Sequence, residues 1–115
     1  MPFMNIGSIS RVIKYKYPKG VKDECLIATV MKSCLEALIY LNENNCLHRD
    51  IKPENILLSS DGTICLCDMG VATFLKPGCK KNSMRGSFAW NAPEIFLSED
   101  YDWKVINKLK LYYLR

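Results

Sequence analysis

The stretch that decides the fold is His48-Arg49-Asp50-Ile51-Lys52-Pro53-Glu54-Asn55, which gathers basic, acidic and amide side chains in one short segment. An apolar run at residues 56–58 follows it, then Ser-Ser-Asp-Gly at 59–62, then a second apolar run at 64–67. Two short apolar runs around an Asp-Gly turn predict a β-hairpin. Asp68-Met69-Gly70 comes directly after the second run, so the hairpin separates two polar segments that can carry chemistry.

These two segments and the downstream Ala92-Pro93-Glu94 follow the order and spacing of three protein-kinase motifs. The first resembles the catalytic loop, the second the magnesium-binding Asp-Phe-Gly, and the third the Ala-Pro-Glu that closes the activation segment. One such motif would be weak, but the linked set makes coincidence remote. The sequence therefore resembles the serine/threonine protein kinases, and the resemblance implies transfer of a phosphoryl group from ATP to a protein.

The resemblance gives five side chains a place in this chemistry. Asp50 would orient the substrate hydroxyl and accept its proton, and Lys52 would reach the transferring phosphate. Asn55 and Asp68 carry the oxygen ligands that Mg²⁺ prefers beside substrate phosphates, and the hairpin is expected to bring them together. Leu57 matches the residue under the adenine of ATP; it can also be read as a core leucine, and the two interpretations are compatible. An isolated loop aspartate more often caps the backbone, but within this set of motifs the catalytic role is favoured.

Lys52 also indicates the substrate class. Serine/threonine kinases carry a lysine two residues after the catalytic aspartate, whereas tyrosine kinases usually carry alanine or arginine nearby, so the expected partner is a protein substrate with serine or threonine. His48, the only histidine, would by resemblance be a packing residue and not a general base. It is expected to contact Met69, next to Gly70, because methionine keeps the apolar contact that phenylalanine makes in relatives.

Further positions concern regulation and the activation segment, whose polar, basic residues 75–89 predict a loop. In kinases with an arginine before the catalytic aspartate, here Arg49, a phosphate on this segment pairs with that arginine. Ser83 falls where relatives carry a phosphorylated threonine, or is a solvated loop serine. Ser87 matches the threonine that contacts the catalytic aspartate. An upstream kinase or a scaffold is therefore a possible partner, and Glu94 would pair structurally with an arginine of the later kinase domain.

Several short segments narrow the resemblance to the Ste20/germinal-centre group, and within it to the SPAK/Fray-like branch. They are Met1-Pro2-Phe3-Met4, Gly7-Ser8, Tyr17-Pro18, Gly20, Ile27-Ala28-Thr29, residues 38–41 and Gly70-Val71. Two segments depart from that branch, which usually has Lys-Ala-Gly-Asn at residues 52–55 and Gly-Thr-Pro at residues 86–88. The departures concern the branch alone and leave the kinase motifs intact.

The resemblance implies an α+β, partial kinase-like fold with the hinge, C-lobe helices, catalytic-loop hairpin and activation segment. Apolar residues at spacings of three and four predict an amphipathic helix over 24–44, with Asp23 as its N-cap. Residues 8–13 predict a short helical turn, and residues 14–22, with Pro18 and Gly20, predict a basic connector. Residues 71–74 predict a further short strand.

The resemblance covers residues 1–104, and the tail 105–115 diverges from it. The six glycines form no Gly-rich phosphate loop, and the strand lysine and helix glutamate of a kinase N-lobe have no match. We therefore expect a truncated catalytic domain that is weak or inactive alone, since positioning supplies most of the rate of phosphoryl transfer. Two alternatives stay open: a non-catalytic interaction module whose basic loop (76–85) binds acidic partners, and a truncated gene product without function.

Composition sets the outer limits on function. The 115 residues are 49% hydrophobic and 24% charged, which is typical of a globular chain and not of a disordered one. A net charge of +4 is too small to indicate nucleic-acid binding, and no apolar run approaches the roughly 18 residues of a membrane span. No secretory signal is visible, so a cytoplasmic or also nuclear location and reduced cysteines are expected. Cys65 and Cys67 lack the second ligand pair of a zinc site.

Overall fold

The computed structural model describes residues 3–97 and 100–102. Two compact units divide the described chain. The first contains residues 3–37 and 53–67, and the second contains residues 38–52, 68–97 and 100–102. Helices and small antiparallel sheets are mixed in the chain, which confirms the expected α+β class. The tail expected at 105–115 and the end of the kinase-like part at Lys104 lie outside the described residues.

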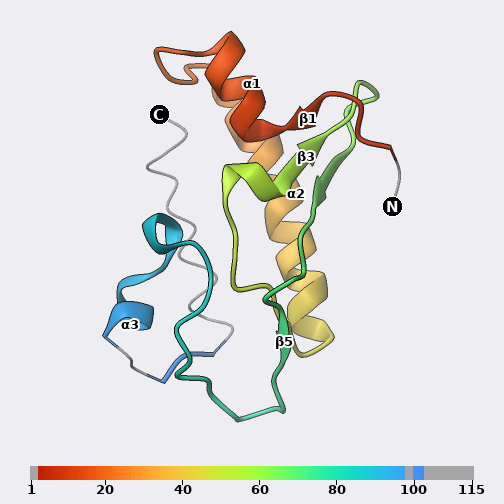
Figure 1. The fold of residues 1–115 in the computed structure, drawn as a ribbon. Helices are drawn as coiled ribbons and strands as arrows, with labels where there is room; N and C mark the ends of the chain where they lie inside the picture. The colour runs from red at the N-terminus through yellow and green to blue at the C-terminus, as the bar shows by residue number, and fades with distance from the viewer. Residues whose placement is uncertain (1–2, 98–99, 103–115) are drawn as a thin grey trace. The chain divides into compact units, whose positions relative to one another are not determined.

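A three-stranded antiparallel sheet is the centre of the first unit, with strand order β1-β3-β4 (Figure 1). β1 spans Gly7–Ser8, β3 spans Ile56–Leu58 and β4 spans Ile64–Leu66. The β3–β4 pairing confirms the predicted hairpin. Its connection is longer than a two-residue Asp-Gly turn, because the Ser59 N–H donates to the Thr63 carbonyl at 2.9 Å and closes a wider loop.

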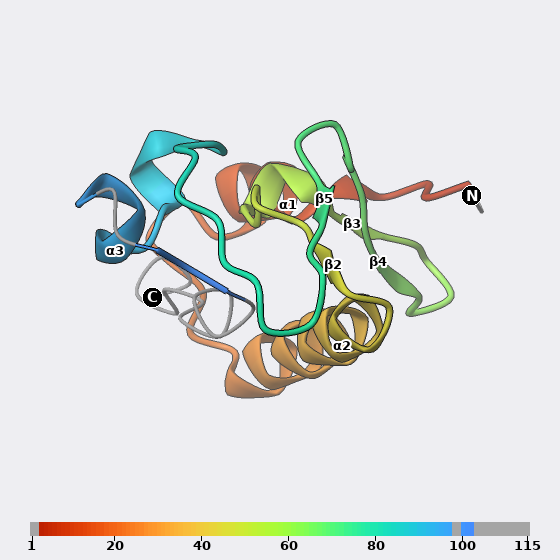
Figure 2. The same cartoon turned by 90° about the horizontal axis from the view of Figure 1, so that it is seen from below.

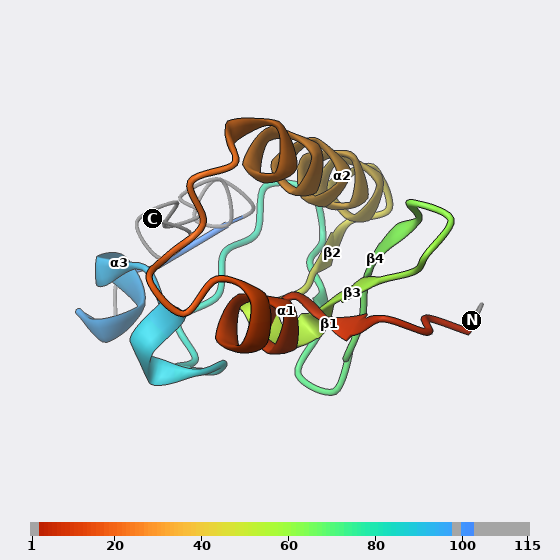
Figure 3. The same ribbon diagram turned by 90° about the horizontal axis from the view of Figure 1, so that it is seen from above.

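Helix α1 (Ile9–Lys16) packs beside β1 and β3, as Figure 3 shows. It begins where the Ser8 hydroxyl accepts the Arg11 N–H at 3.3 Å. The prediction of a helical turn over 8–13 followed by a connector from residue 14 was therefore too short. The helix continues through Lys14-Tyr15-Lys16 because no breaker stands before Pro18, and cations in its last turn suit the helix dipole.

Helix α2 (Glu24–Glu43) confirms the long amphipathic helix, ending one residue earlier than predicted. The predicted cap is present, since an Asp23 carboxylate oxygen accepts the Leu26 N–H at 3.0 Å. Val30, Cys34 and Leu38 follow one another at intervals of four and are buried. Asn45, with φ 53°, turns the chain after the helix in the left-handed conformation that asparagine tolerates.

The second unit contains a two-stranded antiparallel sheet, in which β2 (Cys46–Leu47) pairs with β5 (Thr73–Phe74) (Figure 2). The predicted strand 71–74 is thus two residues shorter. The core of this unit is the cluster of Leu47, Leu75, Ile95 and Tyr101.

The predicted loop 75–89 is mostly irregular, but it holds an antiparallel bridge between Lys81 and Tyr101. A 3₁₀ helix, η2 (Phe88–Trp90), and the short helix α3 (Pro93–Phe96) follow it, and neither was predicted. Within the described residues no helix is both long and apolar enough to cross a bilayer. All six cysteines are free thiols.

Candidate active site

Asp50, Lys52 and Ser87 form one hydrogen-bonded group in the second unit. The Lys52 ammonium lies 2.7 Å from Asp50 Oδ2 and 2.7 Å from the Ser87 hydroxyl oxygen. The Ser87 backbone N–H donates to Asp50 Oδ1, also at 2.7 Å. Both carboxylate oxygens are therefore held by hydrogen bonds. The structure thus brings the predicted base, the predicted phosphate-binding lysine and one predicted regulatory serine together.

The surroundings of Asp50 favour its charged form. Only 9% of this residue is exposed, and burial on its own would raise the pKa of the carboxyl. The hydrogen bonds from Lys52 and Ser87 and the lysine charge outweigh that effect, so the pKa of Asp50 lies below its ordinary value. The carboxylate is ionised at neutral pH and can accept a hydrogen bond from a hydroxyl group.

His48 supports the catalytic loop from inside the protein. Its side chain is fully buried, and its Nδ1 accepts the backbone N–H of Asp50 at 3.3 Å. The buried ring therefore contacts the backbone of Asp50 itself. Met69 keeps 46% of its surface exposed, and its expected contact with His48 stays a prediction.

Arg49 joins three segments that are far apart in the sequence. Its Nε donates to the Val71 carbonyl at 2.7 Å, and its Nη1 donates to the Ser83 hydroxyl at 3.1 Å. The Tyr101 hydroxyl donates to the Ser83 carbonyl at 2.7 Å and holds the same residue from another side. Arg49 and Ser83, which the resemblance had related through a phosphate, therefore meet directly as unmodified side chains.

Gly86 and Asn91 shape the turn that presents Ser87, and sequence reasoning missed both. Gly86 has φ 89°, and a Cβ atom there would overlap the backbone oxygen of Arg49. Asn91 is buried, and its side-chain amide donates to the Arg85 carbonyl at 3.0 Å. A glycine directly before Ser87 was the one available signal, because only glycine fits a left-handed turn pressed against another backbone.

The expected magnesium ligands lie in different units. Asn55 belongs to the first unit, where it is buried at the end of the 3₁₀ helix η1 (Pro53–Asn55). Its backbone carbonyl accepts a hydrogen bond from the Cys67 N–H at 2.8 Å. Leu57 is half-buried in β3 of the same unit. Asp68 belongs to the second unit, is exposed, and has φ 64°. A shared site of Asn55 and Asp68 therefore stays a prediction.

The donor set suits a cation that takes most of its ligands from phosphates and water. An amide oxygen and a carboxylate are the hard ligands that Mg²⁺ accepts. One Asp68 oxygen accepts the Gly70 N–H at 3.2 Å, which holds the carboxylate while leaving its other oxygen available. Among the described residues no group of three or more histidine, cysteine or acidic side chains could enclose a metal ion by itself.

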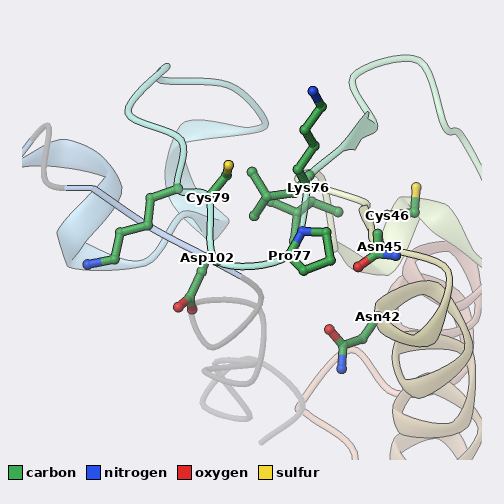
Figure 4. Close-up of a pocket in the computed structure, with 11 residues that line it drawn as sticks. Asn42, Asn45, Cys46, Lys76, Pro77, Cys79 and Asp102 are labelled. Atoms are coloured by element: carbon green, nitrogen blue, oxygen red, sulfur yellow. The ribbon is translucent and has the colours of Figure 1, made fainter.

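The second unit also has a hollow of about 360 Å³ between the end of α2 and the activation segment (Figure 4). Leu47 and Leu75 from the core line it, and Figure 4 shows the Asp102 carboxylate below the Pro77 turn. Cys46 lies at its edge, where burial raises the pKa of the thiol and makes it a poor nucleophile. None of the predicted catalytic residues lines this hollow.

Comparison with known proteins agrees with the motifs and their geometry. Residues 1–105 match the family model described as protein kinase domain. The chain belongs to this family. Members of the protein kinase family in general use ATP with Mg²⁺.

Individual kinases resemble the chain at similar levels. It is 38% identical to serine/threonine-protein kinase fray1 and 40% identical to fray2 of Dictyostelium discoideum, each over 107 residues. It is also 38% identical over 106 residues to serine/threonine-protein kinase PAK 1 of Mus musculus. Each match covers 91% of this kinase chain but only 18%, 10% and 19% of these relatives. The two fray kinases confirm the expected resemblance to the Fray-like branch, and PAK 1 has the same identity to the chain as fray1.

Proposed function

We propose that this chain carries the catalytic loop and activation segment of a serine/threonine protein kinase, which transfers the terminal phosphoryl group of ATP to a protein hydroxyl. The observation that carries the proposal is the Asp50–Lys52–Ser87 group, in which an ionised carboxylate and a cation are held side by side. The names of the relatives, all serine/threonine-protein kinases, support the substrate class.

In this proposal Asp50 accepts a hydrogen bond from the serine or threonine hydroxyl of the substrate. The hydroxyl oxygen forms a bond to the terminal phosphorus while the bond from that phosphorus to the ADP oxygen breaks, and the hydroxyl proton passes to Asp50. Lys52 exchanges its hydrogen bond with the Ser87 hydroxyl for one with the transferring phosphoryl group, where its charge offsets the developing negative charge. Ser87 holds Asp50 through its backbone N–H throughout.

Asn55 and Asp68 are the residues that we propose to hold Mg²⁺ in the nucleotide complex. When bound, Mg²⁺ supplies neutralisation of the phosphate charge. Asp68 contributes a carboxylate that the Gly70 N–H holds at 3.2 Å. A Cβ atom at residue 70 would lie 3.0 Å from that oxygen, so a side chain there would require the carboxylate to shift by a few tenths of an ångström.

Calorimetric titration of the chain with ATP and Mg²⁺ tests the proposal. We expect binding that Asp68→Ala weakens by about tenfold or more, because a ligand that neutralises the metal is lost. Asp100→Ala is the matched control, since it removes one exposed carboxylate elsewhere in the same unit and should bind as the unchanged chain does. Equal binding by the Asp68 and Asp100 variants, or no binding by any of the three proteins, would contradict the proposal.

We also propose Ser83 as the acceptor of a regulatory phosphate from an upstream kinase. Ser83 is exposed and already lies 3.1 Å from the Arg49 guanidinium, so a phosphate there would gain charge-assisted hydrogen bonds. Incubation with an active upstream kinase and ATP, followed by mass spectrometry, should find phosphate on residues 82–85. Ser83→Ala is the control, and absence of phosphate from this peptide in the unchanged chain would refute the assignment.

A further inference from the structure

The first unit carries an open hollow of about 600 Å³ on one side of α1. Its apolar lining comes from four separate parts of the chain: Ile6 before β1, Val12 in α1, Leu26 in α2 and Leu58 in β3. Tyr15 and Tyr17 stand at its edge. Ile6 is 41% exposed and Tyr15 is 73% exposed, so large apolar surfaces face solvent at this hollow. Exposed apolar surface of this kind marks interaction sites.

The edge of the hollow is strongly basic. Arg11 and Lys16 line it, and Lys14, Lys19 and Lys22 belong to the same segment of sequence without lining the hollow. Residues 9–24 hold five cations and two carboxylates, which gives this short segment +3 of the chain's net charge of +4. None of the five cations forms an ion pair within residues 3–97 and 100–102, where the ion pairs are Lys32–Glu36 and Lys52–Asp50.

The elements that line the hollow are held in place by hydrogen bonds within the chain, so the hollow is preformed. The Ser8 hydroxyl caps the start of α1, and the Tyr17 N–H closes its end on the Ile13 carbonyl at 3.0 Å. The β1–β3 pairing, extended by the Ile6 N–H on the Leu58 carbonyl at 3.2 Å, holds the facing wall. Asp23, the one carboxylate in the lining, is engaged as the cap of α2. Binding therefore orders little of this protein, which favours affinity.

We propose that this hollow is a docking groove for an acidic segment of a partner protein. An apolar side chain of that segment enters between α1 and Leu58, and carboxylates on either side of it meet Arg11 and Lys16. Charge selects this occupant, because a second copy would bring two basic edges together, and nucleic acid would leave the apolar lining unfilled. The groove uses no residue of the proposed phosphoryl transfer, so the two proposals stand or fall separately.

Fluorescence anisotropy with a labelled peptide, Glu-Glu-Leu-Glu-Glu-Leu-Glu-Glu, tests the groove without nucleotide. We expect the chain to bind this peptide, and to bind the version with alanine in place of leucine about tenfold less tightly, because the apolar contacts are lost. Added salt should weaken binding, since the charged contacts lie at an exposed edge. Equal affinity for the alanine peptide, or for a version with lysine in place of glutamate, would overturn the proposal.

Two variants locate the binding site. Lys16→Glu should weaken peptide binding by about tenfold, because an attraction becomes a repulsion. Tyr15→Ala should weaken it through lost apolar contact, and this exposed side chain can be removed with the fold intact, as circular dichroism would verify. Lys80→Glu is the matched control: it makes the same charge change on the activation segment in the second unit and should leave binding unchanged.

The remaining outcomes decide against the groove. If Lys80→Glu weakens binding as much as Lys16→Glu, the peptide responds to overall charge and the proposal is wrong. It is also wrong if a single-stranded oligonucleotide binds more tightly than the peptide and displaces it, or if analytical ultracentrifugation shows that the chain forms a dimer that Tyr15→Ala abolishes.

Discussion

Arg49 and Asp68, two non-glycine residues of the candidate active site, hold φ values of 67° and 64°. The left-handed conformation costs an L-residue about 1–2 kcal/mol, so neither residue is in its most favourable backbone conformation. Both side chains form hydrogen bonds in this conformation. Arg49 donates to the Val71 carbonyl and to the Ser83 hydroxyl, and Asp68 accepts the N–H of Gly70. Backbone strain at residues with assigned roles is typical of functional loops.

Lys52→Met should raise the pKa of Asp50. Burial then acts on the carboxyl without the opposing lysine charge and hydrogen bond, while the Ser87 hydrogen bonds still lower the pKa. NMR titration of the aspartate carboxyl carbons would measure the shift, with Lys76→Met, an exposed lysine of the same unit, as the control. An unchanged Asp50 titration would show that Lys52 does not set its charge.

The Lys52–Asp50 ion pair should also make the free energy of unfolding depend on pH. Because the folded-state pKa of Asp50 is lowered, its stabilising contribution is present above the ordinary carboxyl pKa and is lost as the pH falls through the folded value. Urea unfolding at a series of pH values should therefore show the unchanged chain more stable than Lys52→Met at neutral pH, with the difference closing in acid. A difference that persists at the lowest pH would contradict this account.

Gly86→Ala should destabilise the second unit and separate Ser87 from Asp50. The new methyl group would overlap the Arg49 backbone oxygen, in addition to the left-handed strain, so the cost should exceed about 2 kcal/mol. Gly78→Ala is a matched control, since Gly78 also has positive φ, at 77°, but has open space around it. Urea unfolding of the two variants measures the difference, and equal losses would rule out the close approach.

At the scale of elements, α2 owes its start to one side chain. Asp23→Ala should lower the free energy of unfolding by about 1 kcal/mol, because the Leu26 N–H loses its acceptor. Asp23→Asn keeps an oxygen in the same place and should cost only a few tenths of that amount. Denaturant melts followed by circular dichroism compare the two, and an asparagine variant as unstable as the alanine variant would refute the cap.

The elements that sequence reasoning found and those it missed differ in the range of their interactions. α2 and the β3–β4 hairpin are stabilised by neighbours along the chain, so periodicity and turn residues predict them. β5 lies within the predicted strand 71–74. β1 and β2 have two residues each, and each pairs with a distant segment, as in Gly7–Leu58 and Cys46–Phe74. Two residues show no alternation, so no pattern could reveal these strands.

At the scale of the whole molecule, α2 has apolar residues on more than its buried face. Val30, Cys34 and Leu38 are buried, whereas Leu35 and Ile39 are 42% and 57% exposed. Residues four apart lie on one side of a helix, so Leu35 and Ile39 form an exposed apolar stripe. Such a stripe on an isolated chain promotes association.

Ile39→Lys should therefore reduce self-association of the chain, because it places a charge in the stripe. Asn42→Lys makes the same charge change at an exposed polar position of α2 and should leave self-association as it was. Sedimentation velocity over a range of concentrations measures both variants. If the two lysines act equally, net charge and not the stripe controls association.

The sequence by itself determined the family, because the kinase motifs stand in an order and at a spacing that need no three-dimensional information, and it supplied the residues of the proposed chemistry. It also determined the long helix and the hairpin, which are local structures. The resemblance had already related Ser87 to Asp50 and Ser83 to Arg49, but only the tertiary structure decided through which atoms these residues meet. Ser87 reaches Asp50 across 37 residues and Ser83 reaches Arg49 across 34, through a turn that depends on Gly86 and Asn91. Contacts over such separations form only when packing repays the entropy of closing the loop, which no local pattern records.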